Sequence, residues 1–226
     1  MRFLLLGHGK TGSLVEEVAC ERGHKVRVLR SAENLQGKAL SAETLRDEDV
    51  VIDFTNSEAA VHNMEACARA GKSIVVGTTG WYGEVPRIKA LAEKSAIGVL
   101  YGGNFSIGVN LFFEVARTAA AALRHNYAGQ IFERHHAHKR DAPSGTAMVL
   151  RDAVREVSGT ELEITSFREG EVVGLHELVL NSSVDKIYLC HDAKSRRGFA
   201  EGAVRGAEWL TGKKGFFNFK DIWREL

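Results

Sequence analysis

The stretch LLLGHGKTGSL, residues 4–14, decides the fold of the first half of this chain. Its glycines Gly7, Gly9 and Gly12 have the G-x-G-x-x-G spacing, directly after an apolar run that is typical of a buried strand. In a βαβ unit that binds a dinucleotide, the first glycine permits a tight turn, the second lets the backbone approach a pyrophosphate, and the third lets helix and strand pack closely. A plain glycine turn is the alternative, and the context downstream favours dinucleotide binding.

Short apolar runs alternate with helix-like stretches through the first half of the chain. Strands are expected at residues 3–6, 26–29, 50–54, 73–76 and 97–100, and helices at residues 12–22, 58–70 and 86–94. Strands that are apolar throughout and separated by helices are typical of a parallel sheet that is covered on both faces. The pattern therefore predicts an α/β fold with a Rossmann-like, doubly wound parallel sheet.

The pattern changes after about residue 105. Strands are expected at residues 130–135, 163–168, 175–181 and 186–191, and helices at residues 108–123, 146–157, 200–210 and 220–226. Three of these strands follow one another without a helix between them, which indicates antiparallel pairing. A second, α+β domain with a mixed or antiparallel sheet is therefore predicted.

The composition restricts the class of protein. The 226 residues carry a formal net charge of +1, so nothing suggests binding to nucleic acid or to a membrane. No apolar run approaches the roughly 20 residues of a transmembrane helix, and the N-terminus lacks a signal-peptide pattern. Cys20, Cys67 and Cys190 lie far apart, which fits reduced thiols in the cytoplasm better than a zinc site or a disulfide framework. A cytoplasmic protein is expected.

The choice of dinucleotide depends on the end of the second strand. An NAD-selective site usually has an acidic residue there, which holds the ribose hydroxyls. This strand ends at Leu29 and is followed by Arg30, and the acid Glu33 comes later. Arg30 and Lys10 are suited to a 2′-phosphate, which favours NADPH over NADH, although both side chains could equally be solvated.

Three further turns follow predicted parallel strands, at residues 53–58, 75–80 and 101–110. Ligands bind at this edge of such sheets. Thr78 and Thr79 could therefore bind ribose or nicotinamide, or simply close the turn. Phe105 could pack against a flat ring, while Ser106 and Asn110 are suited equally to helix caps and to ligand contacts.

The stretch ERHHAHKRDAPSGTA, residues 133–147, crowds histidines and cations together. In a continuous strand, Glu133, His135 and Lys139 would share one face, with His135 and Lys139 about 13 Å apart. That separation is too large for one small ring, so either the chain turns after His136 or the two side chains have different roles. The DAPSG sequence that follows favours a turn.

Three interpretations of this stretch compete. A metal site is disfavoured because adjacent histidines on a strand diverge, so no metal is expected. A solvated surface run is possible. The third is an anion and acid-base site, in which a histidine delivers a proton and Lys139 binds a carboxylate or imine. Ser144, Gly145 and Thr146 begin a helix, whose N–H groups and hydroxyls favour an anion, so we favour a site for a small dicarboxylate.

The chain resembles the dihydrodipicolinate reductase family in the glycine motif, the DFT at Asp53, VVGTTG, NFSIGVN, the stretch 133–147 and SRRGFAEGAVRGAEWL. These motifs run in family order across nearly the whole chain. The resemblance implies a dinucleotide domain of residues 1–105 plus 196–226, and a substrate-binding and oligomerisation domain of residues 106–195. It also implies a homotetramer and the NAD(P)H-dependent reduction of 4-hydroxy-tetrahydrodipicolinate, a dicarboxylate heterocycle, in lysine and diaminopimelate biosynthesis.

The resemblance also assigns roles to residues of this sequence. His135 would be the proton donor, with Lys139 as a second donor that also binds substrate. The substrate carboxylates would be held by His136 and by the helix start at Ser144, Gly145 and Thr146. The cofactor would be lined by Gly7, His8, Gly9, Lys10, Thr11, Gly12, Gly77, Thr78, Thr79, Gly102, Gly103, Asn104 and Phe105.

Two other functions share the front motif. A different two-domain dehydrogenase that acts on an amino or keto acid would need the glycine loop but leaves the histidine-rich stretch unexplained. A dinucleotide-binding sensor without activity would have no need for both His135 and Lys139.

Overall fold

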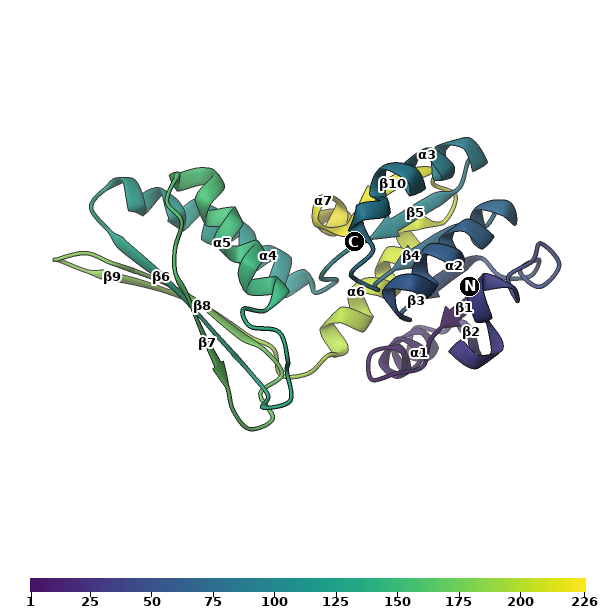
Figure 1. Ribbon diagram of the computed structural model, residues 1–226, viewed down its shortest axis with the longest axis horizontal. Helices are drawn as coiled ribbons and strands as arrows, with labels where there is room; N and C mark the ends of the chain where they lie inside the picture. Colours follow the sequence, from purple (N-terminus) through teal and green to yellow (C-terminus); the bar gives the residue numbers. More distant parts are fainter. The chain divides into compact units, whose positions relative to one another are not determined.

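The computed structural model describes residues 1–226. The chain forms two compact units. It begins in the first unit, forms the whole of the second, and then returns to complete the first. Unit 1 contains Met1–Ser106 and Arg197–Leu226, and unit 2 contains Ile107–Arg196. Figure 1 shows helices and strands in both units.

Unit 1 is built on a six-stranded parallel sheet with the order β10-β5-β4-β3-β1-β2. Its strands are β1 (Arg2–Leu6), β2 (Lys25–Leu29), β3 (Val50–Asp53), β4 (Ile74–Val76), β5 (Gly98–Tyr101) and β10 (Gly215–Asn218). Its helices are α1 (Gly12–Glu21), α2 (Ser57–Arg69), α3 (Val85–Ser95), α6 (Arg197–Leu210) and α7 (Phe219–Ile222). The predicted doubly wound parallel sheet is confirmed.

The helices of unit 1 cover both faces of this sheet (Figure 1). Helices α2 and α3 pack against each other over one face, where Leu4, Val51 and Ile74 contribute to one apolar core. Helices α1 and α6 pack against each other, and α6 lies against β3, β4 and β5. Strands β3 and β4 are buried throughout, because helices shield them on both sides. This explains why their sequences are continuously apolar.

The strand β10 was not predicted. It pairs in parallel with β5 at the edge of the sheet, with Gly215 opposite Gly98. The helix expected at residues 220–226 is shorter, since α7 ends at Ile222 and a 3-10 turn, Trp223–Glu225, follows. A four-residue strand that is half-buried has too little periodicity to be recognised locally. Its pairing with β5 defines it.

Unit 2 has a four-stranded mixed sheet with the order β7-β6-β8-β9. The strands are β6 (Ala128–His135), β7 (Ile164–Arg168), β8 (Leu175–Asn181) and β9 (Lys186–Asp192), and the helices are α4 (Ile107–Ala119) and α5 (Gly145–Ser158). Strands β6, β8 and β9 are antiparallel, whereas β7 runs parallel to β6. The parallel pair follows from α5, which lies between β6 and β7 in the chain.

One face of the unit 2 sheet packs against the helices. Ile131, Leu178 and Leu180 point to this face and are fully buried against residues of α4 and α5 such as Leu150. Burial alternates strictly along β8, which is typical of a sheet covered on one side only. Across the whole chain, no helix combines the length and the apolar character that crossing a membrane requires.

Candidate active site

The glycine loop after β1 has a shape that only glycine allows at two of its positions. Gly7 has a φ of 84°, and a Cβ there would lie 2.5 Å from the carbonyl oxygen of Phe54. A Cβ on Gly12 would lie 2.4 Å from the carbonyl oxygen of Gly7. Gly9 differs, because a Cβ there would meet nothing within 4 Å. The first and third glycines therefore build the turn, and the second leaves open space before α1.

A depression of about 360 Å³ lies in front of this turn. It is lined by Gly9, Lys10, Thr11, Gly12, Phe54, Thr55, Asn56, Gly77, Thr78 and Thr79. Gly77 is needed here too, because the ring of Phe54 lies 2.3 Å from where its Cβ would be. The fold thus brings the glycine loop and the Gly77–Thr79 turn to one depression at the start of α1, which fits the pyrophosphate of a dinucleotide.

The floor of this region is held by the buried carboxylate of Asp53. It accepts hydrogen bonds from Thr55 Oγ1 at 2.7 Å, Thr78 Oγ1 at 2.9 Å and Asn63 Nδ2 at 2.7 Å. Burial raises the pKa of Asp53, and these hydrogen bonds oppose the rise. Of the two alternatives for Thr78, a ligand contact or closure of the turn, the second describes its hydroxyl, which donates to Asp53.

The two cations suited to a 2′-phosphate come from different segments, Lys10 from the glycine loop after β1 and Arg30 from the end of β2. Arg30 and Lys10 are both exposed. Glu33, which follows too late in sequence for the usual acidic position, folds back so that its Oε2 accepts a hydrogen bond from the N–H of Arg30 at 2.8 Å. The carboxylate of Glu33 therefore does reach the end of β2, beside Arg30. His8 of the glycine loop forms an exposed pair with Glu16 at 2.7 Å.

The turn after β5 is buried more deeply than expected. Gly102 is buried, and a Cβ there would lie 2.9 Å from Cβ of Phe219. The ring of Phe105 is only 2% exposed and packs against Phe219, with ring centroids 4.6 Å apart. The side chain of Phe105 therefore belongs to the core, and the expectation that its ring packs against a flat ligand ring is wrong. Gly103 is exposed, and Oδ1 of Asn104 accepts a hydrogen bond from the N–H of Ser106 at 2.9 Å.

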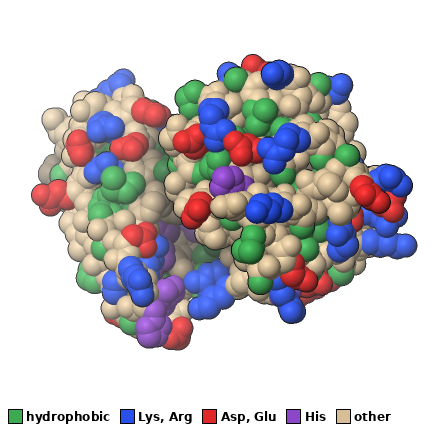
Figure 2. Space-filling model, turned by 45° about the vertical axis from the view of Figure 1, so that its right-hand side comes forward, with side chains coloured by type: hydrophobic (Ala, Val, Ile, Leu, Met, Phe, Trp, Pro, Cys, Tyr) green, Lys and Arg blue, Asp and Glu red, His purple; other side chains and the backbone are tan.

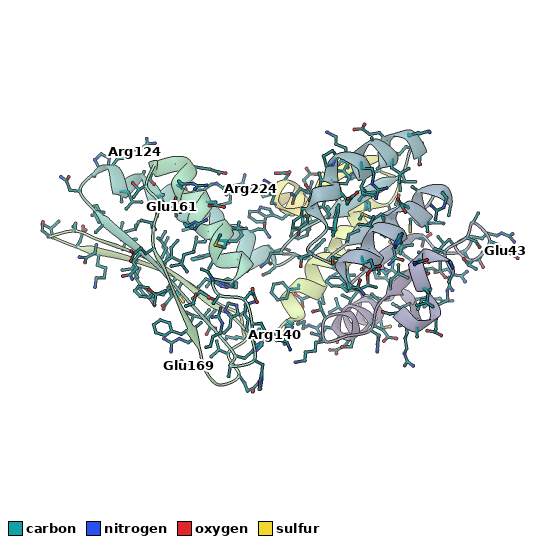
Figure 3. All side chains as sticks on the ribbon, in the orientation of Figure 1. Glu43, Arg124, Arg140, Glu161, Glu169 and Arg224 are labelled. Atoms are coloured by element: carbon teal, nitrogen blue, oxygen red, sulfur yellow. The ribbon has the colours of Figure 1, made fainter.

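In unit 2, the chain turns immediately after β6 ends at His135. The N–H of Lys139 donates to the carbonyl oxygen of His136 at 3.1 Å, which closes this turn. Glu133 and His135 lie on the buried face of β6, as the alternation of a strand predicts. His138 and Arg140 are exposed on the loop, where Figure 3 labels Arg140.

The carboxylate of Glu133 lies at the centre of a group of charges. It is fully buried, and its Oε2 lies against Nδ1 of His135 as an ion pair. Its Oε1 accepts a hydrogen bond from Nη2 of Arg168, at the end of β7, at 2.7 Å. Burial raises the pKa of Glu133, but Arg168 and the neighbouring polar groups outweigh it, so the pKa lies below its usual value. Glu133 is therefore charged at neutral pH.

Ser144 is the N-cap of α5. Its Oγ accepts a hydrogen bond from the N–H of Ala147 at 3.2 Å and lies 3.2 Å from Nε2 of His176. Ser144 is 2% exposed, so its hydroxyl supports the helix start rather than facing solvent. Gly145 is exposed, and a Cβ there would meet nothing within 4 Å. The start of α5 is thus open to an anion at Gly145 and the half-buried Thr146.

The cations of the stretch have defined neighbours. Nζ of Lys139 lies 2.7 Å from Oδ1 and 2.8 Å from Oδ2 of Asp141. Nη2 of Arg196 lies 3.3 Å from Nε2 of His136. Because a guanidinium only donates, Nε2 of His136 is the acceptor in this contact. Lys139 and Arg196 therefore place positive charge around the turn after β6, and His136 accepts from one of these two cations.

The titration of His135 is set by opposing influences. Burial lowers its pKa, Glu133 raises it, and the charges of Lys139 and Arg168 lower it, with a net lowering. His176, which lies beside it with ring centroids 5.2 Å apart, has its pKa lowered to about 4, chiefly by burial. His176 is therefore uncharged at neutral pH, whereas the Glu133 carboxylate beside His135 opposes the lowering of the pKa of that histidine.

The donor atoms of Glu133, His135 and His176 lie within 4.8 Å of one another, which raises the question of a metal ion. One oxygen of Glu133 is already held by the guanidinium of Arg168, and the charge of Lys139 acts on both histidines. A dication here would have two permanent cations as neighbours. The cluster is therefore an ion-pair network built around one carboxylate.

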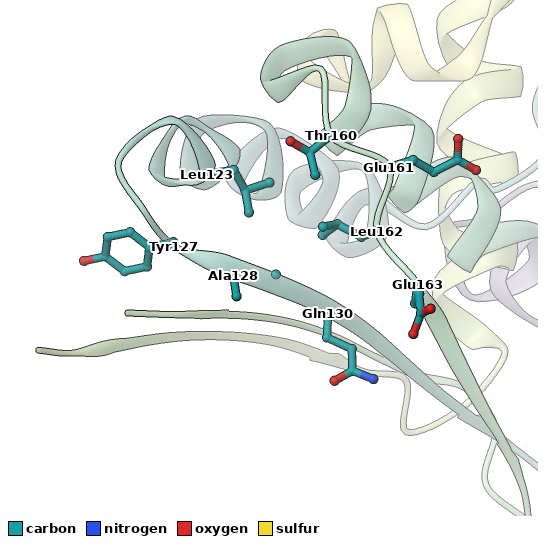
Figure 4. Close-up of a pocket in the computed structure, with 9 residues that line it drawn as sticks. Leu123, Tyr127, Ala128, Gln130, Thr160, Glu161, Leu162 and Glu163 are labelled. Carbon is teal, nitrogen blue, oxygen red and sulfur yellow. The ribbon is translucent and has the colours of Figure 1, made fainter. Parts of the chain in front are cut away.

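Unit 2 has a hollow of about 340 Å³ at the start of β6, at the other end of this strand from His135 (Figure 4). It is lined by Leu123, Tyr127, Ala128, Gly129, Gln130, Thr160, Glu161, Leu162 and Glu163. It contains none of the predicted site residues.

Charged side chains of both signs are interspersed over the face seen in Figure 2.

Sequence reasoning missed Arg168, His176 and Asp141. Arg168 and His176 reach His135 because β7 and β8 both pair with β6, and nothing in their local sequence indicates this. The alternation of a strand did place Glu133 on the face of His135, but it gave no indication that the carboxylate would pair with that histidine.

Comparison with known proteins places the chain in a family. Residues 1–105 match the family model described as dihydrodipicolinate reductase, N-terminus, and residues 108–223 match the one described as dihydrodipicolinate reductase, C-terminus. The 4-hydroxy-tetrahydrodipicolinate reductase of Christiangramia forsetii is 36% identical over 240 residues, covering 100% of this chain and 99% of the relative. That of Archaeoglobus fulgidus is 37% identical over 249 residues, covering 95% and 96%.

Solved structures share the fold. The dipicolinate-bound dihydrodipicolinate reductase from Paenisporosarcina sp. TG-14 is similar with a TM-score of 0.81 at 22% identity, covering 98% of this chain and 99% of that one. A probable dehydrogenase from Thermotoga maritima is similar with a TM-score of 0.60 at 12% identity, covering 98% and 92%. Because both family models match and relatives align along nearly their whole length, this chain belongs to the dihydrodipicolinate reductase family.

Proposed function

We propose that this protein is a 4-hydroxy-tetrahydrodipicolinate reductase, which reduces its substrate to tetrahydrodipicolinate with NAD(P)H in lysine and diaminopimelate biosynthesis. The observation that carries the proposal is the surroundings of His135. A histidine that can carry a proton lies in the same unit as Lys139 and the open helix start at Gly145. These are the groups that a reaction on a dicarboxylate ring requires. The names of the aligned relatives support the same activity.

The two units divide the work in this proposal. Unit 1 binds the cofactor at the depression in front of α1, and unit 2 binds the substrate. The nicotinamide of the bound cofactor supplies a hydride. One hydride and one proton are added in total, and the hydroxyl of the substrate leaves as water. His135 supplies the proton from Nε2, because Glu133 occupies the other nitrogen.

The substrate carboxylates are recognised by charge and by the helix start. Lys139 is 22% exposed and is paired with Asp141, so it can exchange that partner for a ligand carboxylate. His136 lies at the turn beside it. The N–H groups at Gly145 and the hydroxyl of Thr146 serve the second carboxylate. Ser144 contributes indirectly in this scheme, by capping α5.

NADPH is the favoured cofactor, and NADH is accepted less well. Arg30 and Lys10 offer two exposed cations to a 2′-phosphate. Glu33 beside the N–H of Arg30 is positioned to accept from ribose hydroxyls, which supports some use of NADH. The ratio of kcat/KM with NADPH to kcat/KM with NADH measures this preference.

We further propose a homotetramer and a cytoplasmic location. The face of the unit 2 sheet that is turned from the helices exposes Phe167 and Tyr188, at 40% and 56%. Large apolar side chains on an exposed sheet face favour association with another copy. The three unpaired cysteines favour a reducing compartment. Light scattering in solution tests the tetramer.

The experiment for the main proposal follows the loss of reduced cofactor. Purified protein is mixed with freshly prepared 4-hydroxy-tetrahydrodipicolinate and with NADPH or NADH. Turnover with NADPH exceeding that with NADH is expected, and His135→Gln should reduce kcat at least 100-fold while the Kd for NADPH changes little, since proton transfer contributes about 10²–10⁴-fold. Absence of turnover with both cofactors, or turnover of an amino or keto acid instead, would exclude the proposal.

A further inference from the structure

The two oxygens of the buried Glu133 carboxylate face different groups. Oε1 accepts a hydrogen bond from Nη2 of Arg168 at 2.7 Å, and the N–H of Ser144 approaches the same oxygen at 3.4 Å. Oε2 lies against Nδ1 of His135. Both atoms are buried and neither makes a hydrogen bond, so the contact between them is an ion pair. The carboxylate therefore has one side fixed by a permanent cation and one side turned to the imidazole.

This contact decides which nitrogen of His135 is available. A carboxylate beside Nδ1 favours the proton on that nitrogen, which leaves Nε2 as the nitrogen that exchanges protons with a ligand. The space beside Nε2 is kept clear by Gly174, since a Cβ on Gly174 would lie only 3.1 Å from Nε2. The imidazole thus has one nitrogen held by Glu133 and the other next to a position without a side chain.

Arg168 is also fixed from several sides. Besides Glu133, its guanidinium donates from Nη2 to the carbonyl oxygen of Asp141 at 2.6 Å and from Nη1 to the carbonyl oxygen of Phe167 at 2.6 Å. Asp141 is the residue whose side chain pairs with Lys139. Arg168 therefore joins the Glu133 carboxylate to the loop that carries Lys139.

We propose that Glu133 and Arg168 are positioning residues that hold His135 with its proton on Nδ1 and set the pH range over which Nε2 delivers a proton. This inference rests on the proposed function, in which His135 is the proton donor. Glu133 orients the imidazole directly. Arg168 holds the Glu133 carboxylate in place through a hydrogen bond, and its own positive charge opposes the imidazolium of His135.

The charged and titratable groups around His135 come from every neighbouring element. Glu133 lies on β6, Lys139 and Asp141 on the loop after it, and Arg168 at the end of β7. His176 lies on β8, with His191 opposite it on β9. Glu133 raises the pKa of His135, whereas burial, Lys139 and Arg168 lower it. The proton donor must start protonated, so activity falls as the pH rises through this pKa.

Two substitutions should move this fall in opposite directions. Glu133→Gln removes the negative charge that favours the imidazolium, so the decline of kcat should shift to lower pH. Arg168→Gln removes a positive charge that opposes the imidazolium, so the decline should shift to higher pH. Both should reduce kcat at neutral pH on the order of 10- to 100-fold, as for other partners that orient a functional histidine, while the KM for NADPH changes little.

The matched control is Glu169→Gln. Glu169, labelled in Figure 3, directly follows Arg168 and β7. Its exposed side chain pairs with Arg134. Its substitution should leave the pH profile unchanged. Where Glu133→Gln does not fold, Glu133→Asp and Arg168→Lys keep the charges and should restore the wild-type pH profile in part. Shifts of both Gln variants in one direction, or no shift in either, would overturn the proposal.

A second readout does not depend on activity. In protein labelled with ¹⁵N-histidine, the shifts of the two ring nitrogens report which one carries the proton, and His135→Gln assigns the signals. His135 should be protonated on Nδ1 in the wild type and should lose this preference in Glu133→Gln. A wild-type His135 protonated on Nε2 would refute the inference even if the enzyme is active. A correct tautomer in a protein without turnover would instead place the failure in the proposed function.

Discussion

Asn63 on α2 donates a hydrogen bond of 2.7 Å from Nδ2 to Oδ2 of Asp53 at the end of β3. Both side chains are buried. The amide of Asn63 is fixed from its other side, because its Oδ1 accepts from Nδ2 of Asn34 at 2.8 Å. Asn34 in turn accepts from the N–H of Ala39 at 3.2 Å. One line of hydrogen bonds therefore joins β3, α2 and the segment after β2.

Asp53→Asn should destabilise the protein although it removes a buried charge. The new amide has only one oxygen, so it cannot accept at both positions where the carboxylate accepts. At least one of the neighbouring groups that donate to Asp53 is then left without an acceptor. An unsatisfied buried polar group costs about 1–3 kcal/mol in the free energy of unfolding. Urea unfolding measures this, with Asp47→Asn as the control because Asp47 is exposed and makes only a 3.7 Å ion pair. Equal stability of both variants would contradict the expectation.

Gly9→Ala and Gly12→Ala should separate cofactor binding from folding. A Cβ on Gly9 meets no protein atom, so the stability should stay within about 0.5 kcal/mol of the wild type. Its Kd for NADPH should rise, because the methyl group takes the space of the pyrophosphate. Gly12→Ala should lose both stability and NADPH binding, since its Cβ would lie 2.4 Å from a carbonyl oxygen. Calorimetric titration and thermal unfolding measure the two effects, and unchanged NADPH binding by Gly9→Ala would argue against this site.

Arg30→Gln tests the preference for the phosphorylated cofactor. A hydrogen bond to a charged group contributes about 1.5–3 kcal/mol, so the KM for NADPH should rise about tenfold or more, while the KM for NADH should change little. Glu33→Gln is the complementary variant, and it should weaken NADH more than NADPH. Equal effects of Arg30→Gln on both cofactors would show that Arg30 does not recognise the 2′-phosphate.

Ser144→Ala and Thr146→Ala are expected to act on different quantities. Ser144 caps α5, so its loss should lower the free energy of unfolding by about 1 kcal/mol. Thr146 is expected to contact a substrate carboxylate, so its loss should mainly raise the KM for the substrate. Comparing urea unfolding with steady-state kinetics distinguishes the two. If Ser144→Ala instead raised the KM for the substrate strongly without loss of stability, the hydroxyl of Ser144 would contact the substrate directly.

Glu208 gives a pH dependence of stability. It accepts from Arg22 at 2.9 and 2.7 Å and pairs with His24 at 2.7 Å, and Arg22 lowers its pKa. A carboxyl with a lowered pKa in the folded state stabilises above its unfolded pKa, and this stabilisation disappears as the pH falls through the folded pKa. Glu208→Gln should therefore cost about 0.5–1 kcal/mol at pH 7, and less in acid. A loss that is the same at about pH 3 as at pH 7 would contradict the linkage.

Short-range patterns were sufficient for much of this protein. The glycines at 7, 9 and 12 predicted the turn before α1, because only glycine tolerates the left-handed backbone at Gly7 and the close carbonyl contacts at Gly7 and Gly12. Apolar runs separated by helices predicted the parallel sheet, because strands buried on both faces have no polar side. The distance along a straight strand also indicated that the chain must turn near His136 if Lys139 is to act with His135.

The tertiary structure alone decided what surrounds these residues. Whether Thr78 points its hydroxyl to a ligand or to Asp53 depends on a neighbouring strand, and whether the ring of Phe105 is available depends on Phe219, far away in the chain. Arg168 meets Glu133 only because β7 pairs in parallel with β6. Hydrogen bonds and ion pairs require partners in contact, and pairing of distant strands makes those contacts. The sequence by itself thus determined the fold class and the acid-base stretch, and only the folded chain determined which nitrogen of His135 faces a carboxylate.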